Sequence, residues 1–154
     1  MQPLKSIKYI ILHWTGVPAT KEQIGAVQTL DSVRRYHVQN LGWSEIGYHY
    51  LVLEDGSIKV GRPVKFQGSH CKARGRNTDS IGVCLVGGPL SKGYPTAAQQ
   101  AALKHILPTL CLRHNVPVSN IKQHSDFEPG KPFCASLDMG AVRLNTEAKL
   151  RTMK

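Results

Sequence analysis

Two histidines and one cysteine of this chain are candidate ligands for a metal ion. His13 directly follows a short apolar run, and Cys134 comes ten residues after His124. Two imidazoles and one thiolate form a three-ligand set for zinc and leave the fourth tetrahedral position to water. Structural zinc sites usually have four protein ligands, so a three-ligand set indicates a catalytic site.

The residue types alone leave two other interpretations open, because some His/Cys pairs fall close by chance among seven histidines and four cysteines. His13, His124 and Cys134 with Met139 nearby would make a blue-copper ligand set, although residues 135–138 lack the histidine usual in that loop. Alternatively, Cys134 and His124 would form a thiol nucleophile and its base. The cysteines form no C-x-x-C pair, which excludes a zinc ribbon.

Strands are predicted where short runs are apolar or alternate with polar residues, at 9–12, 48–53, 57–60 and 80–86. Residues 54–56 (EDG) form a turn signal that joins the middle two strands as a hairpin. Alternation along a strand should point His49 away from Tyr48, in a structural role. Cys84 lies in an apolar strand and is expected to be a buried thiol. Residues 61–77 and 115–132 are predicted loops.

Three helices are predicted around these strands. The first covers residues 30–40, with Asp31 or Ser32 as N-cap and Gly42 as its stop. The second begins at the capping box of Thr96 and Gln99, and Pro108 should kink or break it. The third begins after Asp138, its expected N-cap. Because one strand pair is a hairpin, the sequence predicts an α/β fold whose central mixed sheet is flanked by helices.

Composition indicates one folded domain over residues 1–154. The chain is 41% hydrophobic, which excludes a disordered chain. It has no linker or internal repeat that would divide it into two domains. No apolar run approaches the roughly 18 residues of a membrane span. The first 14 residues lack the apolar core of a secretory signal, so synthesis in the cytoplasm is expected. The net charge of +10 predicts attraction to polyanions, which include nucleic acid, anionic lipid and cell-wall polymers.

Ordered motifs extend over about residues 7–138. They are 13–15 (HWT), 42–50 (GWSEIGYHY), 55–56 (DG), 61–62 (GR), 68–70 (GSH), Asn77, 80–88 (SIGVCLVGG), Thr96 with Gln99, and 124–134 (HSDFEPGKPFC). Together they resemble the type-2 family of zinc N-acetylmuramoyl-L-alanine amidases, which includes phage lysozyme-amidases and the peptidoglycan recognition proteins. The likeness is to the phage endolysins in particular, because Cys84 stands where bacterial cytosolic members often have glutamate.

The resemblance implies a peptidoglycan hydrolase that cleaves the bond between N-acetylmuramic acid and L-alanine, with its zinc site in a cleft at one face of the sheet. It implies that His13, His124 and Cys134 bind one Zn²⁺, which would activate water and polarise the amide carbonyl. Tyr48 and Lys131 are then expected to act in catalysis, by stabilising the oxyanion, with Tyr48 also as the proton shuttle.

Two further residues and two departures belong to this resemblance. His70 and Asn77 are expected to contact substrate, although a surface position without function is also open for His70. The third ligand is usually followed by proline, and here Ala135 follows Cys134. The catalytic lysine of phage relatives lies two residues before the cysteine, whereas Lys131 lies three residues before Cys134.

The expected setting is phage lysis. The protein would be made in the host cytoplasm, released by a holin-type partner and active on the periplasmic cell wall as a monomer. A separate wall-binding domain is not expected. The alternative is a peptidoglycan-binding or regulatory protein, because some phage relatives bind and inhibit the RNA polymerase of their phage. Relatives that only bind peptidoglycan lose the cysteine, so Cys134 favours the enzyme.

Overall fold

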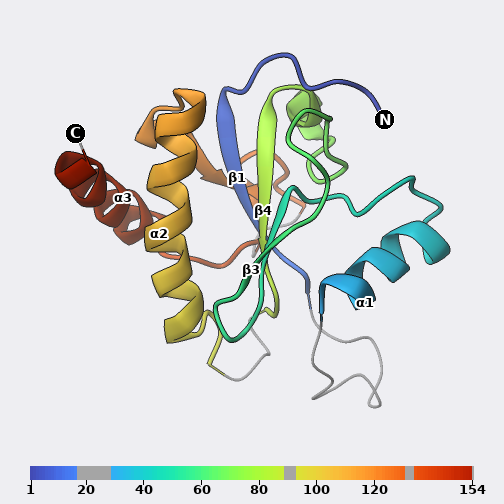
Figure 1. The fold of residues 1–154 in the computed structure, drawn as a ribbon, viewed down its shortest axis with the longest axis horizontal. Coiled ribbons are helices and arrows are strands. Elements are labelled where there is room, and N and C mark those ends of the chain that lie inside the picture. The colour runs from blue at the N-terminus through green and yellow to red at the C-terminus, as the bar shows by residue number, and fades with distance from the viewer. Residues whose placement is uncertain (17–28, 89–92, 131–133, 154) are drawn as a thin grey trace.

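The computed structural model describes residues 1–16, 29–88, 93–130 and 134–153, and it shows a mixed sheet between helices (Figure 1). The sheet has five strands in the order β3-β2-β4-β1-β5. Their bounds are Tyr9–Trp14 (β1), Tyr50–Val52 (β2), Ile58–Val60 (β3), Ser80–Leu85 (β4) and Ile121–Gln123 (β5). β1 pairs in parallel with β4 and β5, β2 pairs in parallel with β4, and β2 and β3 form the expected antiparallel hairpin. The predicted mixed sheet is confirmed.

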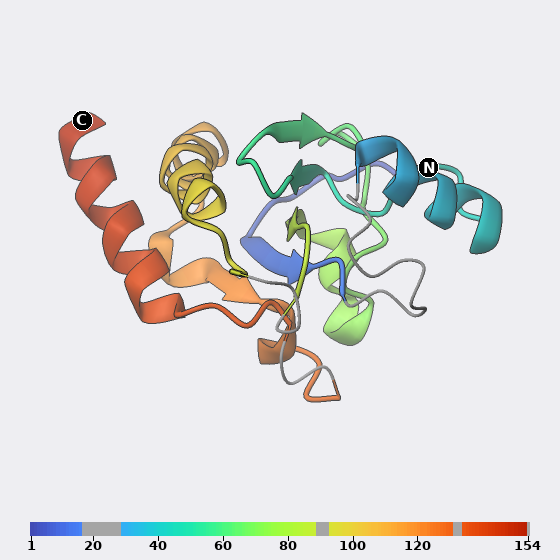
Figure 2. The same cartoon turned by 90° about the horizontal axis from the view of Figure 1, so that it is seen from below.

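Helices cover both faces of this sheet. They are α1 (Leu30–Arg35, continued by a π-helical turn, Tyr36–Asn40), α2 (Ala97–His114) and α3 (Met139–Met153). Viewed along the sheet, α2 and α3 lie on one side and α1 lies on the other (Figure 2). Short 3₁₀ turns at Ala73–Thr78, Val118–Asn120 and His124–Asp126 complete the described elements. Within the described ranges, no helix is both long enough and apolar enough for a membrane span.

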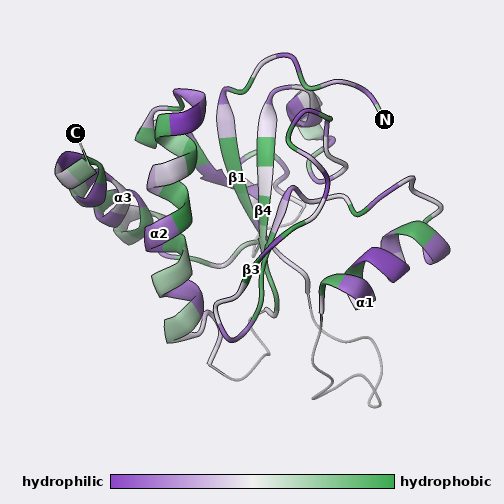
Figure 3. Cartoon of the chain, in the orientation of Figure 1, coloured by the Kyte–Doolittle hydropathy of each residue, from purple (hydrophilic) through white to green (hydrophobic). Residues whose placement is uncertain are grey.

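The two faces of the sheet carry different cores. Ile10 and Leu12 of β1 pack with Leu107 and Leu110 of α2 in the larger hydrophobic cluster. A smaller cluster on the other face joins α1 to the sheet and consists of Val33, Ile46, Leu51, Cys84 and Val86. β1 is hydrophobic over most of its length, whereas α1 alternates hydrophilic and hydrophobic residues (Figure 3). Because strand side chains alternate, His13 lies on the α1 face.

The start of α1 differs from the prediction. Thr29, and neither Asp31 nor Ser32, is the N-cap, because its hydroxyl accepts a hydrogen bond from the Ser32 N–H at 3.1 Å. The Ser32 hydroxyl in turn accepts from the Thr29 N–H at 2.8 Å, which completes a capping box. The expected stop is confirmed, since Gly42 follows the π-helical turn with φ +74°, a conformation that favours glycine.

The capping box of α2 is confirmed. Of the kink or break expected at Pro108, the break is wrong, and a kink stays a prediction. Thr96 and Gln99 exchange the two capping hydrogen bonds at 3.0 Å each. α2 then continues through Pro108 to His114. Proline removes one helical hydrogen bond, and the helix persists because Leu107 and Leu110 on either side are buried in the larger core.

One strand falls in a segment predicted as a loop. β5 is only three residues long, and its sequence Ile-Lys-Gln offers one apolar side chain. Its pairing with β1 therefore depends on the sheet that it joins and is not visible in its own residue pattern. This strand matters because His124 comes directly after it.

Candidate metal centre

Parallel pairing of β1 and β5 brings the two candidate histidines together. Leu12 is aligned with Gln123 in the register of the two strands, so His13 and His124 follow at the same edge of the sheet. Their ring centroids are 4.6 Å apart. The short strand β5 is thus what places His124 beside His13.

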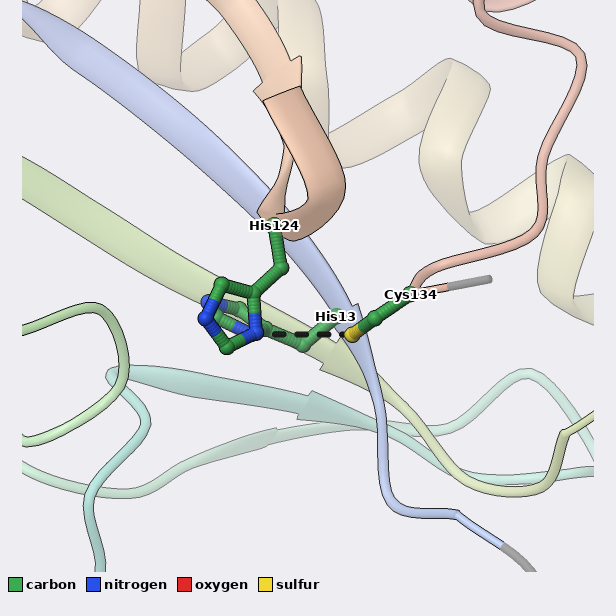
Figure 4. Close-up of side chains that lie close together, drawn as sticks. All are labelled: His13, His124 and Cys134. Atoms are coloured by element: carbon green, nitrogen blue, oxygen red, sulfur yellow. Dashed lines mark hydrogen bonds between the residues drawn. The ribbon is translucent and has the colours of Figure 1, made fainter. Parts of the chain in front are cut away.

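Cys134 reaches the two histidines from the segment that precedes α3 (Figure 4). Its Sγ lies 4.0 Å from His13 Nδ1 and accepts a hydrogen bond from the Trp14 N–H at 3.5 Å. Its carbonyl accepts from the Ser125 N–H at 2.8 Å. The Tyr94 hydroxyl donates to the Ala135 carbonyl at 2.6 Å, so this turn is held without the proline usual in the family that the motifs resemble.

The three side chains fit a tetrahedral metal ion of the zinc type. One ligand atom from each lies within 4.8 Å of the others, and no second group of three or more His, Cys, Asp or Glu residues with this geometry occurs in the described part of the chain. Tetrahedral zinc with two imidazoles and one thiolate would place these atoms roughly 3.4 to 3.6 Å apart. A small contraction would therefore complete the site. Met139 belongs to the larger core on the opposite face from His13, which gives no support to the blue-copper interpretation.

Each histidine is held from behind through its other ring nitrogen. His13 Nε2 is hydrogen-bonded to His70 Nδ1 at 2.9 Å, and His124 Nε2 lies 2.6 Å from a carboxylate oxygen of Glu128. The atom that each ring turns toward Cys134 is then Nδ1, as Figure 4 shows for His124. Such outer hydrogen bonds orient imidazole ligands and fix their tautomers.

Burial keeps His13 and its partner His70 in their neutral form. Desolvation, followed by the nearby His70, lowers the pKa of His13 well below 6.5, and desolvation, followed by His49, does the same for His70. A neutral imidazole has the lone pair that a metal ion requires. His13 is thus in the protonation state that metal binding needs at neutral pH, and His70 is a neutral partner for it.

Tyr48 lies beside the three candidate ligands. Its ring centroid is 5.4 Å from that of His13, and its hydroxyl is hydrogen-bonded to the Cys84 thiol. Burial, followed by the influence of Cys84, raises the Tyr48 pKa well above 10, so the hydroxyl keeps its proton. The expected buried thiol at Cys84 is confirmed, and burial raises its pKa as well.

Tyr48 and His49 were expected to point to opposite faces as neighbours in a strand. Regular strand structure begins only at Tyr50, so this alternation does not apply to them. Tyr48 packs in the same cluster as Leu51, three residues away. His49 is fully buried, with Nε2 bonded to the Phe66 carbonyl at 2.8 Å and Nδ1 accepting from the Gly82 N–H at 3.0 Å. These contacts agree with its expected structural role.

The two residues expected to contact substrate are engaged inside the protein. His70 is 7% exposed, so the surface position left open for it is wrong, and its Nε2 lies 3.2 Å from Ser80 Oγ. Asn77 Oδ1 accepts hydrogen bonds from the N–H groups of His70 and Cys71 at 2.9 and 2.8 Å. Substrate contact by either residue stays a prediction. Lys131 lies outside the described residues.

Two residues behind the site were missed in the sequence. Glu128 had a readable signal, because an acidic residue four positions after His124 can fold back onto it. Ser80 had no such signal, since only the folded sheet brings it near His70 and His13.

The chain is similar to known proteins in sequence and in fold. The family described as N-acetylmuramoyl-L-alanine amidase matches residues 3–134. The endolysin of Klebsiella phage KP32 is 35% identical over 134 residues, which cover 84% of this chain and 81% of that protein. Peptidoglycan-recognition protein SC2 of Drosophila melanogaster is 31% identical over 101 residues, or 66% of this chain and 53% of that protein. The solved structure of the N-acetylmuramoyl-L-alanine amidase LysC from Clostridium intestinale URNW matches with a TM-score of 0.75 and 26% identity, over 92% of this chain and 86% of that one.

Proposed function

The chain belongs to the N-acetylmuramoyl-L-alanine amidase family, and we propose that it cleaves the amide bond between N-acetylmuramic acid and L-alanine of peptidoglycan at a zinc centre formed by His13, His124 and Cys134. It is a peptidoglycan hydrolase of the endolysin type. The observation that carries the proposal is the grouping of the three ligand atoms within 4.8 Å at one edge of the sheet. A bound zinc ion there would supply a Lewis acid and a water molecule of lowered pKa.

The protein side chains would prepare the site for this chemistry. His13 and His124 would each present an imidazole nitrogen, and Cys134 would contribute a thiolate that offsets part of the metal charge. Trp14 and Ser125 hold Cys134 through their backbone N–H groups, so the thiolate has a fixed position before substrate binds. Ligands fixed in advance need little rearrangement as charge develops in the transition state.

Tyr48 is the proposed hydrogen-bond donor to the substrate. Its raised pKa suits a neutral hydroxyl that donates to the developing oxyanion, a contribution of roughly 3 to 4 kcal/mol in comparable sites. The bond to Cys84 would hold the hydroxyl until substrate displaces it. Lys131 is proposed as a second, cationic donor on the basis of the family pattern.

The endolysin relatives support a lysis setting for this activity. We propose synthesis in the host cytoplasm, release to the periplasmic wall by a separate holin-type partner, and action as a monomer of one domain. The net charge of +10 supports attraction to the anionic envelope. Binding of a phage RNA polymerase is the less supported alternative, since the described contacts of Cys134 and both histidines form a site for catalysis.

The test is an assay on peptidoglycan-exposed cells. Outer-membrane-stripped Gram-negative cells should lose turbidity with the protein, lose none after chelator treatment, and lose it again when zinc is restored. New N-terminal alanine without new reducing sugar ends would identify the cleaved bond. Clearing that ignores chelator, or that produces reducing ends, would rule out the proposed reaction.

A further inference from the structure

We infer that His70 is a positioning residue for the metal ligand His13, which it holds, through Ser80 and the backbone carbonyl of Arg76, in the one tautomer that can bind metal. The inference rests on the proposed metal centre. It concerns a buried chain of hydrogen bonds that begins at His13 and leads away from the site. No residue of this chain of hydrogen bonds after His13 belongs to the candidate ligands.

The proton positions follow from the outer end of the chain. The Arg76 carbonyl can only accept, and Ser80 Oγ lies 2.5 Å from it, so the Ser80 hydroxyl proton points to Arg76. Ser80 Oγ must then accept from His70 Nε2 at 3.2 Å. A neutral His70 that carries its proton on Nε2 has a bare Nδ1, and that atom accepts from His13 Nε2 at 2.9 Å. His13 therefore has a bare Nδ1, the atom that faces Cys134.

The opposite arrangement would block metal binding. If His70 turned its Nδ1 proton toward His13, then His13 Nε2 would have to accept, and the His13 proton would move to Nδ1. A protonated Nδ1 has no lone pair for a metal ion. The geometry supports the first arrangement, because the Ser80 hydroxyl donates to the Arg76 carbonyl and so meets His70 Nε2 as an acceptor.

The outer end is anchored in rigid structure. Ser80 is fully buried at the start of β4 and pairs with Tyr9 of β1. The Arg76 guanidinium lies over the rings of Tyr9 and Phe127 at 4.9 and 5.5 Å from their centroids. These contacts fix the carbonyl relative to the strand that carries His13, so the tautomer is determined by the fold.

The His70 ring itself has no room to turn. A Cβ at Gly82 would lie 2.6 Å from His70 Cγ, and a Cβ at Gly68 would lie 2.5 Å from His70 Cδ2. Distances under 3.0 Å are not tolerated, so the ring sits between two glycine backbones. Asn77 Oδ1 holds the His70 backbone at the same time. Ring position and backbone position are therefore both set.

The test measures metal binding by the purified full-length protein. The protein is stripped with chelator and titrated with Co²⁺, and binding is followed by the thiolate-to-cobalt charge-transfer band. Zinc affinity is measured by competition with a chromophoric chelator. His70→Phe removes the acceptor and keeps an aromatic ring. His70→Asn keeps an acceptor near the Nδ1 position. His49→Gln is the matched control, because His49 is a buried neighbour, 5.8 Å from His70 between ring centroids, whose own bonds go to backbone groups.

We expect His70→Phe to weaken both metals by about 10- to 100-fold and to change the cobalt spectrum. His70→Asn should restore most of the affinity and the wild-type spectrum, and His49→Gln should match wild type. Unchanged affinity in His70→Phe overturns the inference. So does an equal loss in folded His70→Phe and His70→Asn, since packing alone would then explain it.

Folding is followed by circular dichroism and urea unfolding in chelator. Where His70→Phe does not fold, Ser80→Ala decides, because it removes only the hydroxyl that accepts from His70. A smaller loss, below about tenfold, is expected there, and wild-type affinity overturns the inference. If the wild type binds neither metal, the proposed metal centre itself fails. If the wild type binds both and the His70 variants do so equally well, only the role of His70 fails.

Discussion

His13 and His124 present the same kind of atom to the proposed metal centre, but different parts of the molecule hold them. Behind His13 stands a neutral imidazole, His70, which is 57 residues away in sequence and buried. Behind His124 stands a carboxylate, Glu128, which is four residues away and 38% exposed. We call the hydrogen bonds from His13 through His70 and Ser80 the buried arm of the site. We call the hydrogen bond from His124 to Glu128 the exposed arm.

The difference shows how one site can combine rigidity with charge. The buried arm ends on a backbone carbonyl, carries no net charge and is protected from salt. The exposed arm brings a negative charge next to His124, which makes that imidazole a stronger ligand, but water can replace a half-exposed carboxylate. The buried arm should therefore have the larger effect on metal affinity, because it fixes the ligand geometry, and the exposed arm should have a smaller effect that depends on salt.

Removal of the third ligand, Cys134, which neither arm holds, should have the largest effect. In Cys134→Ser, the two histidines keep their outer partners but lose the thiolate. We expect kcat/KM for release of N-terminal alanine from purified peptidoglycan to fall by about 1000-fold or more, because the lost metal contributes several kcal/mol to the barrier. Cys111→Ala, in α2 and away from the site, should keep wild-type activity. A Cys134→Ser enzyme with a tenth of normal activity would contradict the role of Cys134.

Gly82→Ala should disturb the buried arm alone. The new Cβ would lie 2.6 Å from His70 Cγ and 2.9 Å from Nδ1, so the ring must shift away from His13. We expect a loss of zinc affinity of about 10- to 100-fold, measured by chelator competition, and a fall of about 1 to 3 kcal/mol in the free energy of unfolding. Gly130→Ala, where a Cβ meets nothing within 4 Å, is the control for a glycine substitution. Normal zinc affinity in Gly82→Ala would mean that His70 can move without consequence.

The sequence predicted the three candidate ligands and missed Ser80 and Glu128, which take part in the hydrogen bonds around the two histidines. His13 and His124 could be read because one ends an apolar run and both lie in motifs of a known family. His70 was found, but its role was not, because its partners His13 and Ser80 meet it only through the sheet register. Residues that meet only through such hydrogen bonds leave no periodic pattern in the sequence.

The same limit applies to the fold. The strands with several apolar or alternating residues were predicted, and the mixed sheet with flanking helices followed from them. β5 was not, since one apolar residue in three carries no periodicity. The helix at Pro108 persists for a reason that only the tertiary core supplies. Local patterns thus predicted the elements, while pairing and burial determined the exceptions.

On the exposed arm, Glu128→Gln should have a smaller effect than His70→Phe or Gly82→Ala has on the buried arm. The glutamine oxygen can still accept from His124 Nε2, and only the charge is lost. We expect zinc affinity to fall by less than about tenfold, with a difference from wild type that shrinks as salt rises, because exposed charges are screened. Titrations at low and high salt measure this. A loss as large as that of His70→Phe would reverse the order of the two arms.

Acid should lower the stability of the fold through its buried histidines. Burial lowers the pKa of His49 from 6.5 to about 4, so the folded protein favours its neutral form. This contribution to stability is complete above pH 6.5 and is lost as the pH falls from about 6.5 toward about 4, because the unfolded chain takes up the proton first. Between pH 7 and pH 5 the loss from His49 is roughly 2 kcal/mol. Desolvation of His13 and His70 acts in the same direction.

His49→Gln separates this effect from acid effects elsewhere. Glutamine can donate to the Phe66 carbonyl as His49 Nε2 does, but it cannot take up a proton. Urea unfolding in chelator, at pH 7 and at pH 5, should show a fall for the variant that is roughly 2 kcal/mol smaller than the fall for wild type. Equal falls in the two proteins would show that His49 does not cause the acid sensitivity.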